Sequence, residues 1–246
     1  MKTNMETKLQ FTKSEGTLSS LALEKINASL PAGDQIYQML RTAILEMQLM
    51  PGSAISEAEI GSKIGASRTP VREALLRLRE EGLIHTLPSR GNFVSTISRS
   101  RILEAQFLRE GLELANVRRV AEFGLSQEME LELRQNLEKQ TAATADEDYS
   151  NFHKLDDEFH LLLARATGFE RAALVLEREK MQLDRMRSLS LKVEGRLQFL
   201  LGEHRAIFAA VLERNIELAR DRTRHHCRSI LDVLEDLSER HEEYFS

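Results

Sequence analysis

Four side chains in the second half of the chain have the types and the spacing of a metal site. Asp156 and His160 stand four residues apart, which places both on one face of a predicted helix. His204 and His226 each fall in the apolar stripe of a later helix, so three helices would bring one Asp and three His together. These groups are suitable ligands for a divalent transition metal. The alternative interpretation of any one His is a hydrogen-bonded core residue. His153, four residues before Asp157, is an equally good candidate for a metal ligand.

Arg109 has a side chain of the type that binds a carboxylate ligand. A planar guanidinium can hold both oxygens of a carboxylate. Glu113 follows four residues later, however, and an ion pair within one helix explains the two residues nearly as well. Arg185 and Arg187 are weaker candidates for the same role.

A second group of polar residues, in the first half, has the spacing of a DNA contact. Arg68 and Arg72 share one face at the start of a predicted helix, where they can reach phosphates or guanine edges together. Arg90-Gly91 lies in a predicted turn, where glycine permits close approach to a minor groove. The candidate DNA-binding residues are Ser67, Arg68, Thr69, Arg72, Arg90 and Gly91. For the two helix arginines alone, solvated surface charges are the alternative.

The elements that must position this second group follow a recognisable order. An amphipathic helix begins near residue 32 and stops before Pro51-Gly52. Ser56 and Glu59 form a capping box that opens a short helix, and a longer helix runs from about Thr69 to Gly82. Two short apolar segments around a Pro/Gly/Asn turn then predict a β-hairpin. This order is that of a winged helix-turn-helix, whose second helix enters the major groove.

The metal and carboxylate candidates lie in a long helical region. From Ser100 to about residue 240 proline is absent, and breaks in the helical period predict about six helices packed as an antiparallel bundle. The fold class is therefore mostly α, with an N-terminal winged helix-turn-helix and a C-terminal all-α bundle. We expect three parts, namely a mobile extension at 1–31 with a short helix near 18–26, a DNA-binding domain at 32–98, and a helical domain at 99–246.

Composition limits the classes of protein that this chain can be. Its 246 residues suit two domains, and its single cysteine excludes an internal disulfide framework. No apolar run approaches the roughly 20 residues needed to cross a bilayer, so we expect a cytoplasmic protein without membrane contact. Residues 1–101 carry 13 Lys and Arg against 10 Asp and Glu, whereas residues 102–246 carry 21 against 29. The acidic second half argues against DNA contacts there.

The first half resembles the DNA-binding domain of GntR-type transcriptional regulators. The resemblance covers about residues 32–98 and rests on the run from Ala66 to Leu75, on Glu81-Gly82-Leu83, and on the run from Arg90 to Val94. It implies that Ser67, Arg68, Arg72, Arg90 and Gly91 meet operator DNA. Some members also use an arginine on the preceding helix, and this chain has Ala58 there.

The second half is similar to the FCD domain, the C-terminal effector domain of the FadR subfamily of these regulators. The similarity spans about residues 102–240 and rests on Asp-x-x-x-His, on His-Arg-Ala-Ile-Phe and on a third His 22 residues later. It implies that Asp156, His160, His204 and His226 hold a metal. A similar Arg-x-x-x-Glu on the family's first helix faces the pocket, as Arg109 would here. The chain departs from the family at Phe169, where Asn is usual, and at Cys227, where Leu is common.

These features together predict a regulator rather than an enzyme. We expect a homodimer that binds a palindromic operator in double-stranded DNA, acts as a repressor, and answers to a small organic acid bound near the metal. Zinc is the first expectation for the metal, with nickel or manganese as alternatives. A metal-dependent hydrolase is the rival function. A metal that is purely structural, or that is itself the signal, is a third possibility.

Overall fold

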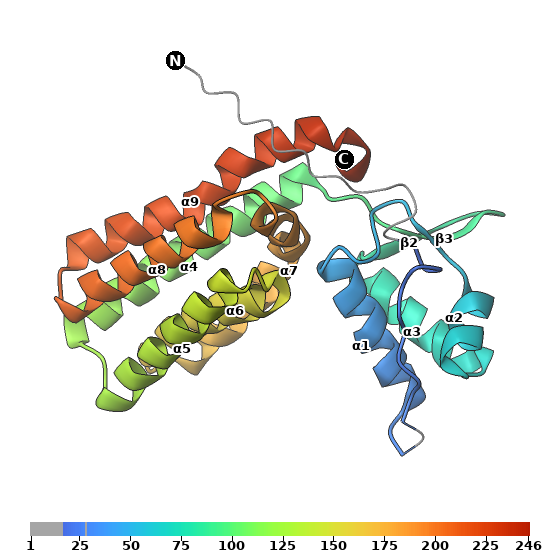
Figure 1. Ribbon diagram of the computed structural model, residues 1–246, viewed down its shortest axis with the longest axis horizontal. Helices are drawn as coiled ribbons and strands as arrows, with labels where there is room; N and C mark the ends of the chain where they lie inside the picture. Colours follow the sequence, from blue (N-terminus) through green and yellow to red (C-terminus); the bar gives the residue numbers. More distant parts are fainter. Residues whose placement is uncertain (1–16, 28) are drawn as a thin grey trace. The chain divides into compact units, whose positions relative to one another are not determined.

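The computed structural model describes residues 17–27 and 29–246, and these ranges form two compact units. One unit contains residues 17–27 and 29–98 together with Arg240–Ser246. The other contains Arg99–Glu239. Both have the fold class predicted from the sequence, a winged helix-turn-helix and a bundle of helices (Figure 1).

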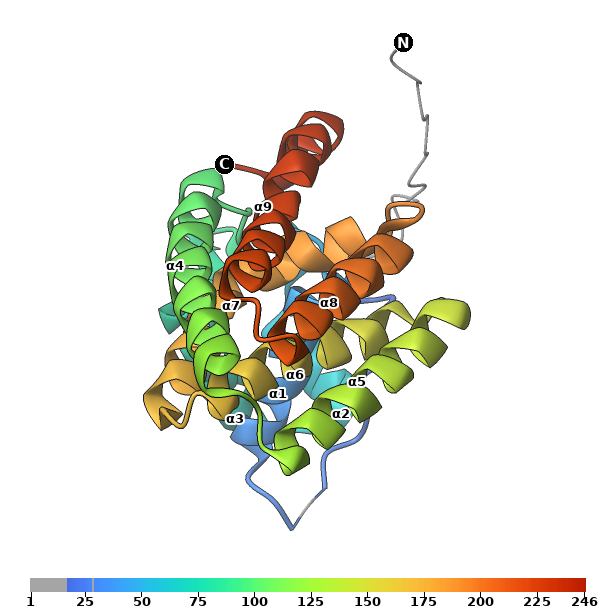
Figure 2. The ribbon, with the colours of Figure 1, turned by 90° about the vertical axis from the view of Figure 1, so that its left-hand side faces the viewer.

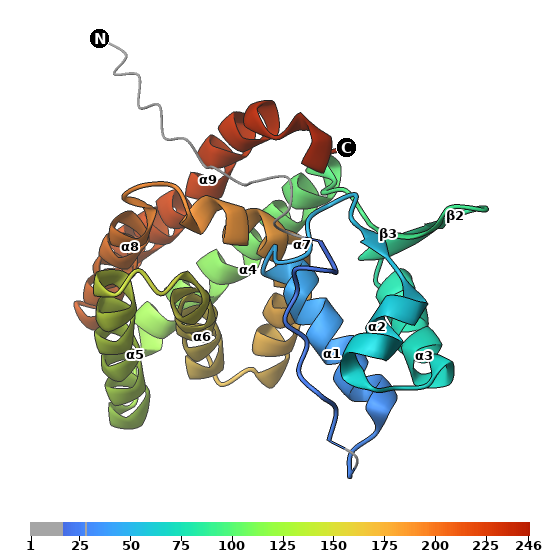
Figure 3. The same cartoon turned by 45° about the vertical axis from the view of Figure 1, so that its right-hand side comes forward.

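Three helices and a small sheet make up the first unit. The helices are α1 (Ala32–Leu45), α2 (Glu57–Ile64) and α3 (Arg68–Glu80), and the strands are β1 (Ala54–Ile55), β2 (Ile84–Leu87) and β3 (Gly91–Val94). Strand β3 lies between the other two, antiparallel to both, with His85 opposite Phe93 and Ala54 opposite Phe93 on its other side. The sequence predicted the β2–β3 hairpin, which extends beyond α2 and α3 (Figure 3), but not the third strand. Two residues are too few to show a periodic pattern.

The connection from α2 to α3 depends on two glycines. Gly65 ends α2 with a φ of 74°, a left-handed conformation that glycine adopts without strain. A Cβ atom on Gly61 would lie 2.9 Å from the carbonyl oxygen of Ala66, so a side chain there would force the turn apart. Ser56 accepts a hydrogen bond from the backbone N–H of Glu59, as the capping box predicted. The two helices are thereby held at a fixed and close spacing.

Residues 17–27 and 29–31 differ from the mobile extension that the sequence suggested. Leu18 and Leu21 are buried, and the Lys63 Nζ donates to the backbone carbonyls of Ser19 and Leu21 at 2.7 and 3.0 Å. No helix forms over the described residues of 18–26, where local hydrogen bonds close only a turn at 17–21 and contacts with the folded unit add to them. Residues 1–16 lie outside the described residues.

The last seven residues also differ from the expected division of the chain. The sequence assigned them to the helical domain, whereas Arg240–Ser246 cluster with the first unit. Their contacts explain the difference, since Ile97 and Phe245 form a parallel β-bridge and the Ile97 N–H donates to the carbonyl of Tyr244 at 2.7 Å. A pattern based on helical period could not show a bridge between residues this far apart.

Six helices form the second unit, as the sequence predicted. They are α4 (Arg99–Phe123), α5 (Gln127–Ala145), α6 (Tyr149–Ala166), α7 (Glu170–Leu191), α8 (Arg196–Leu212) and α9 (Ile216–Arg240). Helices α4 and α9 run antiparallel, because Arg99 bonds to Ser238 and Glu110 bonds to Arg228. Figures 1 and 2 show α4, α9 and α8 side by side, with α5 and α6 as a neighbouring pair. No helix in the described part of the chain is both long enough and apolar enough to cross a membrane.

The core of the bundle lies directly beside the polar candidates. Phe152 and Phe159 of α6 are fully buried, together with Leu133 of α5 and Ile207 of α8. Burying one such side chain contributes about 1.5–3 kcal/mol relative to leaving it exposed. Phe159 stacks on His204 with ring centroids 4.5 Å apart, so the apolar core fixes the orientation of that imidazole.

Candidate metal centre and DNA interface

The structure brings the four candidate metal ligands together from three helices. Asp156 and His160 project from α6, His204 from α8 and His226 from α9, and all four are buried. One ligand atom from each lies within 4.8 Å of the others. His153 does not join them, because it lies with Asp157 and Asp184 in a separate group. The neighbouring His225 is 60% exposed, as its position off the apolar stripe predicted.

Two of the three imidazoles are held so that one nitrogen faces the cluster without its proton. His204 Nδ1 lies 2.7 Å from the Gln140 side-chain oxygen, and His160 Nδ1 lies 2.7 Å from Glu113 Oε2. Both acceptors favour a proton on Nδ1, which leaves a lone pair on Nε2. The Nε2 atoms of His160 and His226 face each other at 3.0 Å, and His204 Nε2 lies 3.3 Å from Asp156 Oδ1. Imidazole nitrogens and a carboxylate oxygen that converge in this way suit a bound cation.

The protonation states suit metal binding as well. Burial, with His204 and His160 nearby, lowers the pKa of His226 well below its usual value. Burial also lowers the pKa of His204, against the opposing effect of Asp156. For Asp156 burial would raise the pKa, but the charge of Arg187, with His204 beside it, holds it well below its usual range. Neutral imidazoles and an ionised carboxylate are the ligand forms that a divalent metal requires.

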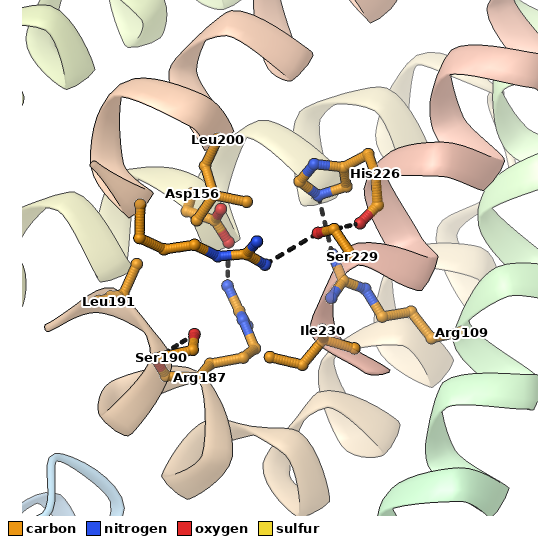
Figure 4. Close-up of a pocket in the computed structure, with 10 residues that line it drawn as sticks. Arg109, Asp156, Arg187, Ser190, Leu191, Leu200, His226, Ser229 and Ile230 are labelled. Carbon is orange, nitrogen blue, oxygen red and sulfur yellow. Dashed lines mark hydrogen bonds and ion pairs between the residues drawn. The ribbon is translucent and has the colours of Figure 1, made fainter. Parts of the chain in front are cut away.

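Arg109 fits both interpretations that the sequence allowed. Its Nε donates to Glu113 Oε1 at 2.5 Å, which is the ion pair expected within one helix. Its Nη2 also lies 3.1 Å from His160 Nε2 and 3.5 Å from His226 Nε2. Burial would lower the pKa of Arg109, but Glu113 raises it, so the guanidinium stays charged. Figure 4 shows Arg109 facing the cavity from the same side as His226.

Arg187, a weaker candidate from the sequence, holds the carboxylates of α6 and α7. It forms ion pairs with Asp156, with Asp157 at 2.6 Å and with Asp184 at 3.6 Å. Burial would lower the pKa of Arg187, but these carboxylates raise it. Arg187 lines a cavity of about 20 Å³ together with Arg109, Asp156 and His226 (Figure 4), whereas Arg185 is not among its lining residues.

The sequence did not indicate two residues of this site, Gln140 and Arg196, or the contact of Glu113 with His160. Gln140 fixes His204, Glu113 fixes His160 in addition to pairing with Arg109, and Arg196 of α8 lines the cavity. The sequence feature that points to Gln140 is its spacing from Asn136. Two amide side chains four residues apart share one face of a helix, and in α5 that face is buried. Nothing in the local sequence marks Arg196, because it stands at a helix start after a loop.

The two residues that depart from the family pattern have separate roles. Phe169 is 57% exposed at the N-terminal end of α7, with its ring centroid 4.2 Å from the guanidinium carbon of Arg119. Cys227 is buried, and its carbonyl accepts a hydrogen bond from Gln106. Burial, with Glu113 nearby, raises the pKa of the Cys227 thiol well above its usual value. Neither residue is among the four clustered ligands.

The candidate DNA-binding residues form an exposed group in the first unit. All six, Ser67, Arg68, Thr69, Arg72, Arg90 and Gly91, are exposed. Helix α3 buries Val71, Ala74, Leu75 and Leu78 on its opposite face. Ser67 is the N-cap of α3, but its side chain makes no capping bond, so the hydroxyl is available to a phosphate. Gly91 follows Arg90 at the start of β3 with a φ of 101°.

The arginines of this group differ in their partners. Arg72 Nε contacts Glu57 Oε2 of α2 at 2.9 Å, and not one of the glutamates of α3. The side chains of Arg68 and Arg90 make no hydrogen bond or ion pair within residues 17–27 and 29–246. Ala58, which stands where some relatives have an arginine, is exposed on α2. Two cations are therefore free to meet an anionic partner, and a third is held in position.

Comparison with known proteins gives the same two parts. Residues 32–94 match the model of the "Bacterial regulatory proteins, gntR family", and residues 104–229 match the "FCD domain" model. An HTH-type transcriptional regulator from an unstable DNA locus of Streptomyces ambofaciens is 39% identical over 212 residues, 86% of this chain and 88% of that protein. The HTH-type transcriptional repressor RspR of Escherichia coli (strain K12) is 32% identical over 222 residues, 90% of this chain and 97% of that protein.

A solved structure shares the fold. Escherichia coli McbR/YncC superposes with a TM-score of 0.69 at 20% identity, covering 84% of this chain and 98% of that one. The relatives in sequence are DNA-binding regulators and not enzymes, which sets aside the metal-dependent hydrolase.

Proposed function

Because this chain belongs to the GntR family of bacterial regulatory proteins and carries an FCD domain, it is a transcriptional regulator, and we propose that it represses transcription under the control of a small carboxylate. The observation that carries the proposal is the convergence of Asp156 and three histidines beside the buried Arg109. The relative RspR is described as a repressor, which supports repression rather than activation by this chain. The site of action is the cytoplasm, where the DNA lies.

The DNA-binding step belongs to α3 and to the β2–β3 hairpin. The exposed N-terminal turn of α3 presents Arg68 and Arg72 to base edges or phosphates, while Ser67 and Thr69 bind phosphate. Arg90 and Gly91 reach the adjacent minor groove. Glu57 contacts only the Nε of Arg72, which leaves its other donors available.

A homodimer follows from the geometry of operator recognition. One winged unit reads a half-site, and two half-sites related by a two-fold axis require two copies. Helix α4 supports such a pairing, because Leu103, Phe107 and Leu108 are 51, 76 and 50% exposed along it. Apolar side chains this exposed mark interaction surfaces. A monomer at micromolar concentration with full operator affinity would contradict the dimer.

The residues of the bundle suit a divalent transition metal. Asp156, His160, His204 and His226 would hold it, with zinc the first expectation and nickel or manganese as alternatives. When bound, the metal supplies positive charge and open positions for a ligand oxygen. Arg109 would then hold a second oxygen of the same carboxylate, in an interior where both contacts are strong.

Control of DNA binding requires that the carboxylate prefer one arrangement of the dimer. A ligand shifts a conformational equilibrium only by its difference in affinity for the two states. The coupling is reciprocal, so operator DNA must change carboxylate affinity by the same factor.

Elemental analysis with native mass spectrometry of the purified protein tests the proposal directly. We expect one metal per chain, a dimer, and a bound organic acid. Operator binding of metal-loaded and chelated protein is then measured with and without that acid. An unchanged response of the chelated protein would assign the metal a structural role, and a response to metal alone would make the metal the signal.

A further inference from the structure

A side-chain network connects the last turn of α3 to the β2–β3 hairpin. The side-chain oxygen of Asn92, on β3, accepts one hydrogen bond from Thr86 Oγ1 of β2 at 2.7 Å and another from Arg79 Nη2 of α3 at 3.3 Å. Asn92 and Thr86 are directly opposed in the antiparallel pair, so both side chains lie on one face of the hairpin. Within residues 17–27 and 29–246, no other side-chain hydrogen bond joins α3 to this hairpin.

Asn92 stands where the supported part of the hairpin ends. Towards the base, Ile84 and Val94 are opposed and buried. Ile55 of β1 lies opposite Asn92, and this is the last pair between β1 and β3 towards the tip. Residues 87–91, at the tip, are exposed (Figure 3). A two-stranded hairpin is only marginally stable on its own, so the position of the tip depends on how its strands are held at Asn92.

The contacts of Asn92 fix its amide in one orientation. A side-chain carbonyl oxygen has two lone pairs, and the hydrogen bonds from Thr86 and Arg79 use both. Turning the amide over would place its N–H groups against the guanidinium of Arg79, which can only donate. The oxygen of Asn92 therefore holds both strands of the hairpin to α3 at this level.

This connection fixes the hairpin relative to the start of α3. Arg68, Arg72 and Arg79 belong to one continuous helix, in which residues are held at a constant rise of 1.5 Å. A hairpin that is held at Arg79 is thereby held at a set distance from the first turn of α3. Arg90 lies at the hairpin tip, two residues before Asn92. Two contacts whose spacing is preset lose less conformational freedom when they bind, and so they bind more tightly.

We propose that Asn92 is a positioning residue for operator binding, which sets the reach of Arg90 into the minor groove relative to the major-groove contacts of α3. The inference rests on the proposed function, which assigns the DNA contacts of Arg68, Arg72 and Arg90. Asn92 acts through Arg90, so its effect on operator affinity exists only while Arg90 is present.

A double-mutant cycle with full-length protein tests the inference. The probe is a DNA duplex that the wild-type protein selects from a random pool, and affinity is measured by fluorescence anisotropy. Asn92→Leu keeps the approximate size of the side chain and removes the acceptor. We expect it to weaken operator binding about three- to fivefold, and by no more than Arg90→Ala does. The same change should cost nothing further in the Arg90→Ala background, but should weaken binding by the full factor in the Arg72→Ala background.

A second pair of variants separates positioning from a general loss of structure. Thr86→Val removes one donor to Asn92 at nearly constant shape and should reproduce part of the loss. Thr42→Val is the matched control, because Thr42 is exposed on α1 and forms no side-chain hydrogen bond with α3 or the hairpin in the described residues. It should bind operator as the wild type does. Thermal melts of these single variants should differ little from that of the wild type.

Footprints on the selected duplex report the two grooves separately. Asn92→Leu should lose the protection from hydroxyl radicals that the hairpin gives in the minor groove. It should keep the protection from methylation that α3 gives in the major groove. Equal weakening of both footprints would mean that Asn92 only stabilises the fold, and would overturn the inference.

The affinities distinguish failure of this inference from failure of the proposed function. A loss of the same size with and without Arg90 would overturn the inference, as would wild-type affinity of both Asn92→Leu and Thr86→Val. Either result leaves the proposed function intact as long as Arg90→Ala itself weakens binding. Wild-type affinity of Arg90→Ala would instead contradict the proposed DNA contact of Arg90, and the inference with it.

Discussion

The two units use the same residue type in opposite ways. In the first unit Arg68 and Arg90 are exposed and make no contact with a carboxylate of the described chain. In the second unit Arg109 and Arg187 are buried and fixed by Glu113 and by three aspartates. Exposed cations attract a polyanion over several ångströms and are screened by salt, whereas buried cations act only on what touches them. The exposure of an arginine therefore indicates which kind of ligand it meets.

The largest expected effect is the loss of effector control from the buried unit. His226→Ala removes one of four clustered ligands, and we expect metal affinity to fall by at least about 100-fold, because changes to outer-shell partners alone cost about 10–100-fold. The response of operator binding to the acid should disappear, while bare operator affinity stays near that of the wild type. Metal titration and fluorescence anisotropy measure the two quantities.

His225→Ala is the matched control for that variant. His225 precedes His226 on α9 but is 60% exposed and lies outside the cluster. His225→Ala should bind metal as the wild type does, and its operator binding should still respond to the acid. Loss of metal from His225→Ala to the same degree would mean that the helix, and not the ligand, had failed.

Arg187→Met tests the contrast between buried and exposed arginines through the free energy of unfolding. The variant leaves Asp156, Asp157 and Asp184 without their shared cation, and breaking such a buried pair costs about 3–5 kcal/mol of unfolding free energy. Urea denaturation of metal-free protein measures the change. Arg134→Met removes an exposed pair with Glu130 and should cost less than about 1 kcal/mol. Similar costs for the two variants would contradict the contrast between buried and exposed arginines.

Arg68→Ala and Arg72→Ala test the exposed unit. Each should weaken specific operator binding by about 1–3 kcal/mol if the side chain reads a base. Thermal stability should change little, because both side chains are exposed. If both variants bound operator as tightly as the wild type does, the placement of α3 in the major groove would be wrong.

Arg90→Ala should have a smaller and different effect. Loss of one phosphate contact lowers affinity for all sequences alike and makes the plot of log affinity against log salt shallower by about one. Arg90→Lys should keep the wild-type slope. A change in sequence preference without a change in slope would assign Arg90 to base recognition.

The smallest expected effect is an alkaline loss of stability in the first unit. Burial and the hydrogen bond to Glu81 raise the pKa of Tyr37 above 10.0, so the folded state holds the proton more tightly than the unfolded state. Stability from this group is complete below about pH 10 and declines as the pH rises above it. Tyr37→Phe should abolish this slope in a comparison of thermal melts, and an equal slope in both proteins would contradict it.

The sequence was sufficient where periodicity or a local motif carried the information. The helical period identified the six helices of the bundle and separated His226 from His225. The capping box of Ser56 and the turn before Arg68 identified the helix pair. Contacts between distant segments left no such pattern, which is why the bridge of Ile97 with Phe245 and the anchoring of Leu18 were missed.

The functional site shows the same limit. His204 was predictable from its place in an apolar stripe, but its partner Gln140 lies 64 residues away. The choice between His153 and His160 was open in the sequence, because both lie four residues from an aspartate. Only the packing of α6 against α8 and α9 brings His160 to the cluster, and packing between helices depends on all of their side chains together.

The single cysteine gives the bundle a built-in kinetic reporter. A thiol reacts as its thiolate and only when a reagent can reach it, and Cys227 is buried with a raised pKa. Its rate of alkylation therefore measures how often the middle of α9 beside His226 opens to water. A bound metal or effector that holds this region closed will slow the labelling, so occupancy can be followed without any introduced probe.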